Sequence, residues 1–414
     1  MFNDSNNNVK NFLKISFGNL IEWYDFAIYG IFALPISRVF FSNLSVHKGL
    51  LLTFLTFAIG FVTRPLGGLI FGILGDRLGR KFAINLSIWL MAIPTILIGF
   101  LPGYDQIGIF ASISLVLLRI LQGVSVGGQF SGLLVVATEN KTKYQPLLVS
   151  LVYAISVVGS LVATIVGLGL TKLPQLSNSA WLDPNQTWRY AFLLSGVIFL
   201  IYIKLNAKFH YSPTDKPKKV HFNLIFKAQP IEFISLILFS ASNGSIYFIL
   251  FSYFVTYMQV YMKINADIAF TIQNVMLVLS IVLYLFFGVI ASIKSDYIRQ
   301  TNKVILVMFI GLVMLYLDTL SIPFELSMFF LLIVCVCAIT SFMISNFSQI
   351  FDDEYRMTAF SLSFNLGTVI AGFAPFIVEM VDHHARQGIW AVTIAMLLII
   401  FISWVMVIRI KSKI

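Results

Sequence analysis

Two acidic side chains inside one apolar stretch are the clearest sign of chemistry in the sequence. Glu22 and Asp25 lie three residues apart, and on a helix they share an arc of about 120° with Asn19 and Tyr29. Two carboxylates on one face in a low-dielectric setting do not both ionise easily, so one holds a proton or a nearby cation neutralises the pair. The spacing therefore predicts either proton carriage or a structural ion pair with an intramembrane arginine.

A second polar group lies on another apolar stretch, where Arg119, Gln122 and Gln129 share a helical arc of about 80°. The guanidinium of Arg119 could hold a substrate carboxylate through paired hydrogen bonds, or it could be the fixed partner of Asp25 or Glu22. The sequence leaves both interpretations open. It makes these polar residues, together with Asn19 and Tyr29, candidates for substrate binding.

Glycine and proline mark two further features. Small residues four apart let helices approach closely, and this packing role is the favoured interpretation here. The steps are Gly123/Gly127 and Gly128/Gly132. Pro65 is expected to interrupt the hydrogen-bond ladder of its helix, and Arg64 to reach the freed carbonyls or an acid, which favours a structural ion pair over a substrate contact.

The second half of the chain offers weaker candidates. No cluster of buried charges is predicted there, and Glu232 and Glu379, near the ends of apolar runs, are expected to be hydrated. Polar residues inside the runs could line a cavity or bond neighbouring helices. They are Asn243, Tyr247, Asn346 and Asn365.

Composition sets the class of protein. Of 414 residues, 58% are hydrophobic and 11% are charged, and the mean hydropathy is +0.90. A soluble domain carries about twice that charged fraction, so an all-α membrane protein is predicted. The net charge of +10 lies in short clusters between apolar runs, which argues against nucleic-acid binding. No phosphate-binding loop or catalytic group is present, so neither an enzyme nor a cofactor is predicted, and His383 and His384 are too weak a sign of a metal site.

Twelve stretches are long and apolar enough to cross a membrane. They are 15–41, 49–74, 82–101, 107–138, 146–170, 189–206, 230–260, 266–292, 303–320, 325–349, 357–381 and 388–408. With both termini in the cytoplasm, 20 of the 28 Lys and Arg residues fall in inner segments, 5 in outer segments and 3 within spans. Because cytoplasmic loops are rich in these residues, the bias predicts that orientation.

A basic, proline-containing stretch after the sixth span divides the chain. The predicted domains are an N-terminal six-helix half at 1–206, a cytoplasmic linker at 207–229 and a C-terminal six-helix half at 230–414. A weak internal repeat supports two related halves, since Gly72–Lys81 after the second span has a degraded counterpart, Ser295–Gln300, after the eighth. Repeated halves with a site between them are typical of secondary transporters.

These motifs resemble the major facilitator superfamily and its metabolite:proton symporter branch, which includes proline/betaine, shikimate and α-ketoglutarate carriers. The matching segments are Gly72–Lys81, Gly18–Gly30, Arg64–Gly68, Arg119–Gly132 and Tyr355–Pro375. The resemblance implies twelve helices in two pseudo-symmetric halves. It also implies a gate at the cytoplasmic ends of the halves, formed by residues of the first loop. These gating residues are Gly72, Asp76, Arg77, Gly79 and Arg80.

The chain departs from this branch in a few places. Gln129 stands where the family commonly has Glu, which puts any proton role of that acid in doubt. The short C-terminal tail argues against an osmosensor, and the compact form is similar to phagosomal amino-acid transporters of intracellular bacteria. The leading hypothesis is proton-coupled uptake of an amino acid or similar zwitterion by alternating access. The alternatives are an organic-acid carrier, a metabolite or siderophore exporter, and, in a different class, a membrane-embedded enzyme or sensor. We expect a monomer in a bacterial inner membrane whose partners are the substrate, protons and lipid.

Overall fold

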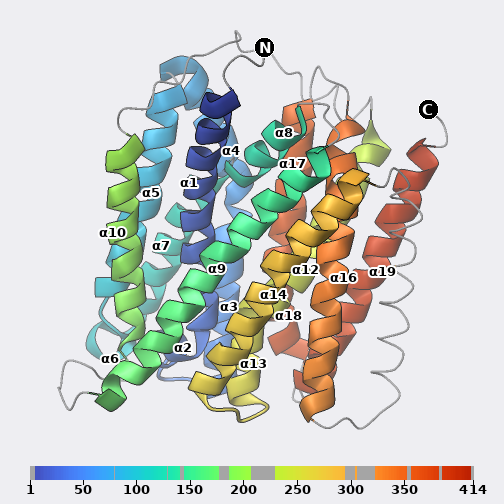
Figure 1. The fold of residues 1–414 in the computed structure, drawn as a ribbon. Helices are drawn as coiled ribbons and strands as arrows, with labels where there is room; N and C mark the ends of the chain where they lie inside the picture. Colours follow the sequence, from blue (N-terminus) through green and yellow to red (C-terminus); the bar gives the residue numbers. More distant parts are fainter. Residues whose placement is uncertain are drawn as a thin grey trace.

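The protein is a bundle of long helices, seen here in a computed structural model (Figure 1). The structure describes residues 5–78, 80–127, 129–139, 144–176, 186–206, 229–293, 304, 322–351, 356–381 and 385–411. Side chains are described from Phe17 onward, apart from some at the ends of helices.

The elements fall into two groups along the chain. The N-terminal group comprises α1 (Ser5–Ile31), α2 (Ala33–Phe40), α3 (Val46–Val62), α4 (Arg64–Leu78), α5 (Arg80–Phe100), α6 (Tyr104–Ile107), α7 (Ile109–Val126), α8 (Gln129–Glu139), α9 (Gln145–Leu176) and α10 (Trp188–Asn206). The C-terminal group comprises α12 (Pro230–Phe248), the π-helical segment η1 (Ile249–Tyr253), α13 (Phe254–Val260), α14 (Ala266–Ile293), α16 (Ile322–Gln349), α17 (Arg356–Gly372), α18 (Ala374–Val381) and α19 (Ala385–Lys411).

These helices follow the predicted spans closely. Apart from Val304, the span predicted at 303–320 lies outside the described residues, as does nearly all of the linker predicted at 207–229. Each of the other predicted spans is one helix or a consecutive series of helices. Helix α1 begins at Ser5, ten residues before the predicted start at 15, because polar residues extend the helix beyond its apolar part. Six of the described stretches are long and apolar enough to cross a membrane by themselves.

Two of the spans break where a proline requires it. Helix α3 ends at Val62 and α4 starts at Arg64, with Pro65 in the first turn of the new helix. The same arrangement recurs at Phe373, where α17 gives way to α18 with Pro375 in its first turn. Proline has no N–H to donate, so it fits the first turn of a helix but not the interior. The break predicted at Pro65 is thus present.

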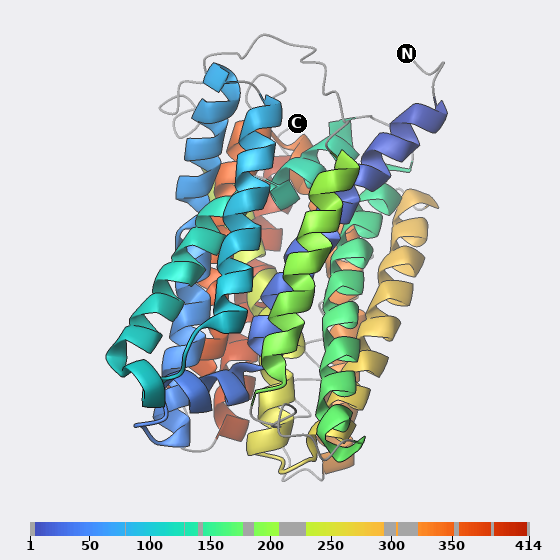
Figure 2. The same cartoon turned by 90° about the vertical axis from the view of Figure 1, so that its left-hand side faces the viewer.

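The helices run along one common axis, and α1 begins at the same end of the bundle at which α19 finishes (Figures 1 and 2). Within the N-terminal group, α7 touches both α4 and α3 backbone to backbone. A Cβ on Gly67 would collide with the carbonyl oxygen of Val124, and one on Gly123 would collide with that of Gly60. The packing role predicted for Gly123 is therefore confirmed, because only a residue without a side chain allows this approach.

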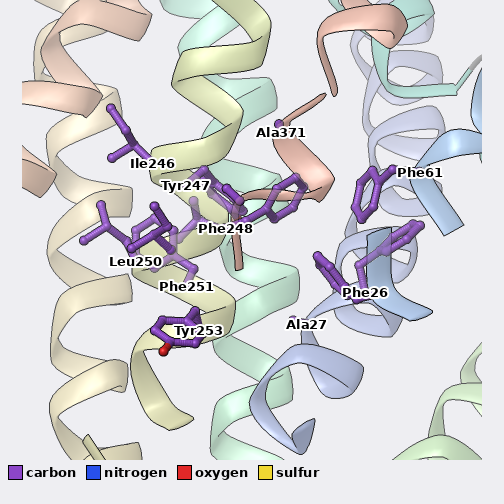
Figure 3. Packing of buried hydrophobic residues seen from close by; sticks show 14 of the residues in the cluster. Phe26, Ala27, Phe61, Ile246, Tyr247, Phe248, Leu250, Phe251, Tyr253 and Ala371 are labelled. Carbon is purple, nitrogen blue, oxygen red and sulfur yellow. The ribbon is translucent and has the colours of Figure 1, made fainter. Parts of the chain in front are cut away.

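Aromatic rings fill the space between the two groups. Trp23 of α1 lies edge-on to Phe130 of α8 and to Tyr247 of α12, with ring centroids 5.5 and 5.0 Å apart. Phe248 packs against Phe61 at 4.7 Å, and both of these rings are buried (Figure 3). Offset and edge-to-face pairs of this kind stabilise a packed interface beyond the area they bury.

Candidate functional site

Asp25 is the centre of a hydrogen-bonded network inside the N-terminal group. Its Oδ1 accepts from Thr95 Oγ1 at 2.8 Å and from Ser195 Oγ at 3.4 Å, and its Oδ2 accepts from Gln122 Nε2 at 2.9 Å. These donors come from α5, α10 and α7, so four helices meet at one carboxyl group that is fully buried. All three donors are neutral. None of the ion pairs between described residues includes Asp25.

Arg119 approaches Asp25 through Gln122. Its Nη1 donates to Gln122 Oε1 at 2.9 Å, while the amide nitrogen of the same glutamine donates to Asp25. The guanidinium carbon lies 4.0 Å from the ring centroid of Tyr29, which places the cation over an aromatic face. Nε and Nη2 of Arg119 have no hydrogen-bond partner in the described part of the chain. The side chain is fully buried, so these two groups are candidates to bind a ligand.

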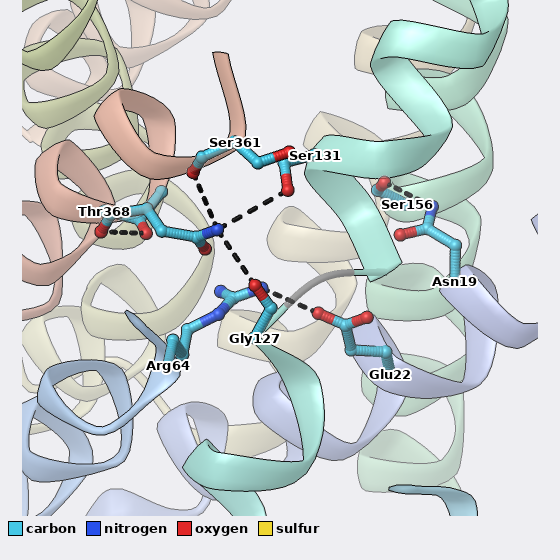
Figure 4. A network of polar contacts seen from close by, with 9 residues as sticks. Asn19, Glu22, Arg64, Gly127, Ser131, Ser156, Ser361 and Thr368 are labelled. Carbon is cyan, nitrogen blue, oxygen red and sulfur yellow. Dashed lines mark hydrogen bonds and ion pairs between the residues drawn. The ribbon is translucent and has the colours of Figure 1, made fainter. Parts of the chain in front are cut away.

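Glu22 has a different environment from Asp25 although only one helical turn separates them. Its Oε1 accepts from Arg64 Nη2 at 2.8 Å, and both side chains are buried (Figure 4). The guanidinium also lies over the rings of Phe26 and Phe61, at 5.6 and 5.3 Å. Glu22 Oε2 and Arg64 Nε lack partners among the described residues, and a small cavity between α1, α5, α7 and α10 borders Glu22. The structure thus joins Arg64 to one of the two predicted acids.

The two acids and two arginines form one buried charge group with a formal sum of zero when all are ionised. A proton taken up by either acid would leave the group with one excess positive charge in a low-dielectric setting. Such a charge is costly unless an anion approaches, and an arginine with free N–H groups can bind a carboxylate. The arrangement can therefore link the uptake of a proton to the binding of an anionic group.

The other two candidates on α1 make structural contacts. Tyr29 donates through its hydroxyl to the carbonyl of Thr53, 3.2 Å away, and presents its ring to Arg119. Asn19 donates to Ser156 Oγ of α9 at 2.9 Å, and its Oδ1 has no partner among the described residues (Figure 4). The residues of the arc predicted on α1 thus contact several different helices rather than one common partner.

Two candidates in the C-terminal group connect it to the N-terminal group. Asn365 of α17 donates to the backbone carbonyl of Gly127 at 2.9 Å and to Ser131 Oγ at 3.4 Å (Figure 4). The hydroxyl of Tyr247 is 3.1 Å from Ser160 Oγ of α9. Both residues therefore lie at the interface between the two groups.

The other two candidates bond within the C-terminal group. Asn243 Oδ1 accepts from Thr340 Oγ1 at 2.8 Å, and Asn346 donates to the carbonyl of Phe342 in its own helix at 2.7 Å. Each of these bonds serves helix packing or helix structure.

Several predicted residues fall where the structure gives no side-chain description. Gly79 lies outside the described residues, and nothing is described of the side chains at the other gating positions or at Gln129. These positions are Gly72, Asp76, Arg77 and Arg80, for which the structure describes the backbone in α4 and α5. Residues 382–384, which include the two adjacent histidines, also lie outside the described residues.

One expectation about the second half was wrong. Glu379 was expected to be hydrated because it lies near the end of a span, whereas it is fully buried and accepts hydrogen bonds from Tyr253, Tyr261 and His47. Helix α18 starts anew after Phe373 and directs this residue into the bundle, which linear position along the span does not reveal.

Sequence reasoning also missed Thr95 and Ser195, the hydroxyl donors to Asp25. Their only signal was a hydroxyl inside an apolar run. Such residues commonly bond within their own helix, so that signal alone does not identify a contact with Asp25.

Comparison with known proteins assigns the fold. Residues 15–355 match the family model described as Major Facilitator Superfamily. The chain is 30% identical over 390 residues to a putative proline/betaine transporter of Staphylococcus aureus (strain COL), covering 88% of this chain and 79% of the relative. A 42% identical match to the shikimate transporter of Escherichia coli (strain K12) extends over 185 residues, 44% of this chain and 41% of that transporter.

Solved structures agree with this assignment. A partially occluded inward-open form of the xylose transporter XylE from E. coli superposes with a TM-score of 0.74 at 16% identity, covering 95% of this chain and 97% of that one. A bacterial homolog of the human lysosomal transporter Spinster gives a TM-score of 0.67 at 14% identity, covering 98% and 97%. The predicted fold class is confirmed: an all-α membrane protein with the major facilitator fold, with which the predicted twelve-helix architecture is consistent.

Proposed function

Because the chain belongs to the Major Facilitator Superfamily, and is therefore a multi-pass membrane transporter rather than an enzyme, we propose that it takes up a small zwitterionic solute together with protons. The solute class we favour is an amino acid or a similar compound, moved by alternating access. Support comes from the relatives named proline/betaine transporters, which match most of the chain. The observation that carries the proposal is the buried group of two acids and two arginines.

Asp25 is the group we assign to the proton. Glu22 is paired directly with the guanidinium of Arg64 at 2.8 Å, whereas the hydrogen-bond donors to Asp25 are all neutral. A neutral carboxylic acid can donate its own hydrogen to the hydroxyl oxygen of Thr95 or Ser195, so Asp25 can take up a proton without losing its partners. Protonation costs less at such a site than at a carboxylate with a direct ion pair.

Arg119 is the group we assign to the carboxylate of the solute. When Asp25 is neutral, the positive charge on Arg119 is no longer balanced, and its Nε and Nη2 have no hydrogen-bond partner among the described residues. An approaching carboxylate would restore neutrality and accept from both nitrogens. Proton and solute would therefore bind cooperatively, which is the requirement for symport.

The remaining binding residues follow from their position between the groups. Tyr247 and Asn365 reach across the interface from the C-terminal group, and we propose that they contact the solute there. Trp23 and its neighbouring rings offer aromatic faces to an ammonium group. We propose lesser, orienting roles for the other sequence candidates. These are Asn19, Tyr29, Gln122, Gln129, Asn243 and Asn346.

Placement in the cell is part of the same proposal. We propose a monomer in a bacterial inner membrane with both termini in the cytoplasm, halves at 1–206 and 230–414, and a linker at 207–229. The charge bias of the loops supports this orientation. A cytoplasmic gate at Gly72–Lys81 stays a prediction of the family resemblance.

An organic acid is the second candidate solute. The match to the shikimate transporter covers 44% of the chain at 42% identity, and it favours a carboxylate without an ammonium group. Such a solute is compatible with the same arginine. Uptake of radiolabelled proline, betaine and shikimate by proteoliposomes, each with and without an imposed pH gradient, separates the two. Shikimate uptake with no amino-acid or betaine uptake would overturn the zwitterion proposal.

Asp25→Asn tests the proton assignment. We expect this variant to lose gradient-driven accumulation while it keeps exchange of labelled for unlabelled solute, because exchange moves no net proton. Thr95→Val is the matched control, since it removes one donor to the same carboxyl group but leaves a group that can still be protonated. Accumulation by Asp25→Asn at the rate of the unmodified protein would exclude Asp25 as the proton carrier.

A further inference from the structure

A second buried acid lies far along the chain from the charge group of α1. Glu379 of α18 is fully buried and accepts three hydrogen bonds. Its Oε2 accepts from the Tyr253 hydroxyl at 2.9 Å, and its Oε1 accepts from the Tyr261 hydroxyl and His47 Nδ1, each at 2.8 Å. We assign the hydrogen of this contact to Nδ1 of His47, since a carboxylate can only accept.

The three donors come from different sides of the bundle interface. Tyr253 belongs to η1 and Tyr261 follows α13, so both lie in the C-terminal group with Glu379 itself. His47 lies in the first turn of α3, in the N-terminal group, and its side chain is 38% exposed. The bond from His47 therefore ties the two groups together, whereas the tyrosine bonds stay within one of them.

This contact lies at the end of the bundle opposite to the start of α1, where α2 and α13 are also found (Figure 1). The neighbouring helices are tightly packed there. The rings of Phe54 and Tyr253 are 5.2 Å apart, and a Cβ on Gly30 would come within 2.6 Å of Ser252 Cβ. The two groups are thus closed against each other at this end of the bundle.

We propose that His47 and Glu379 form a latch that keeps this end of the transport path closed. The latch is independent of which ion or solute is carried and needs only alternating access. When this end opens, Glu379 keeps its two tyrosine donors, because they move with it, and loses the histidine. Only the closed state contains the bond, so the bond biases the equilibrium toward closure.

The size of this bias follows from the kind of bond. A hydrogen bond to an ionised group contributes enough to change a two-state ratio roughly tenfold or more. Substitution of His47 by alanine should therefore raise the ratio of open to closed molecules at this end roughly tenfold. The partly exposed side chain makes the variant compatible with folding.

Spin labels on Asn43 and Asn265 measure the opening directly, because these exposed residues lie in loops of the two groups at this end of the bundle. In His47→Ala we expect a larger population at long distances. Tyr261→Phe is the matched control, since it removes a donor at the same 2.8 Å from the same oxygen without crossing between groups, and should leave the distribution unchanged.

Two further variants make the test decisive. His47→Asn places an amide donor near the position of Nδ1 and should restore much of the closed population. Glu379→Gln keeps an oxygen that can accept from His47 but loses the charge, so it should open this end less than His47→Ala does. The latch is refuted if His47→Ala leaves the distances unchanged, or if Tyr261→Phe opens this end equally. Because the readout is a distance and not transport, the result does not depend on the proton assignment at Asp25.

Discussion

Removal of one partner from the buried Glu22–Arg64 pair should destabilise the protein far more than removal of both. The two atoms of the pair are 2.8 Å apart, and the side chains of Arg64 and Glu22 are 3% and 4% exposed. Three variants test this: Glu22→Leu, Arg64→Met and the double variant. Each single variant leaves a buried charge without its partner, whereas the double variant leaves two apolar side chains.

The expected magnitude follows from electrostatics. At 2.8 Å and an effective dielectric constant of about 20, the attraction is about 6 kcal/mol, which is offset by several kcal/mol of desolvation for each ion. Loss of one partner from such a pair costs about 3–5 kcal/mol. Glu22→Leu should reach this range, because a guanidinium cannot give up its proton. The rings of Phe26 and Phe61 compensate only in part.

The two single variants should respond differently to pH. In Arg64→Met the carboxyl group of Glu22 can take up a proton and become neutral, so its destabilisation should shrink as the pH falls. The destabilisation in Glu22→Leu should not change with pH for this reason, since the remaining arginine stays charged. The double variant should be within about 2 kcal/mol of the unmodified protein, which gives a coupling of at least about 4 kcal/mol at a pH where each single variant loses about 3–5 kcal/mol.

Equilibrium unfolding in mixed micelles provides the measurement. The two native cysteines, Cys335 and Cys337, are free and buried, so their reaction with a thiol-specific dye reports unfolding without any added label. The free energy of unfolding is measured at two pH values for the unmodified protein, the two single variants and the double variant, which completes the double-mutant cycle. A coupling below about 1 kcal/mol would show that the ion pair does not hold these helices together, and equal pH responses of the single variants would refute the charge argument.

Two other predictions concern orientation and packing. A cysteine at exposed Asn43 should react with an impermeant reagent from outside intact cells, and one at exposed Lys204 only after the membrane is opened; the reverse pattern would refute cytoplasmic termini. Gly67→Ala should reduce the stability by about 1–3 kcal/mol, because the new Cβ meets the backbone oxygen of Val124. Gly169→Ala is its control, since a Cβ there meets nothing within 4 Å; equal thermal stability of both variants would contradict the packing argument.

The spans in the described part of the chain could be predicted because length and apolar composition determine a membrane span almost alone. Pro65 also predicted the break between α3 and α4, because the missing N–H of a proline disturbs the hydrogen bonds of its own helix. The pattern on α1 placed Glu22 and Asp25 on one helical face. These features depend on residues close together in the chain, and they are the ones that the sequence alone could yield.

The partners of the acids could not be predicted in the same way. Asp25 binds Thr95 and Ser195, which are 70 and 170 residues away, and nothing in the local sequence distinguishes these hydroxyls from others in apolar helices. Glu379 likewise acquires its burial from α3 and η1. Pairing across helices is a property of the tertiary fold, so the sequence could name the acids on α1 but not decide which arginine each would meet.

Helix α3 joins the two polar sites of the molecule. Its first turn carries His47, which bonds Glu379 at one end of the bundle. Further along, the carbonyl of Thr53 accepts from Tyr29, whose ring lies 4.0 Å from the guanidinium of Arg119. One continuous helix of 17 residues thus touches both the latch and the charge group.

The far end of α3 also faces the charge group. The ring of Phe57 lies 5.7 Å from the guanidinium of Arg119, and the ring of Phe61 lies 5.3 Å from that of Arg64. A regular helix moves as a stiff unit, because each turn is hydrogen-bonded to the next. A change of charge that shifts either arginine therefore acts on the same helix that holds His47 against Glu379. The proposed proton site and the proposed latch therefore share one helix, α3, and any coupling between them needs no relay through the C-terminal group.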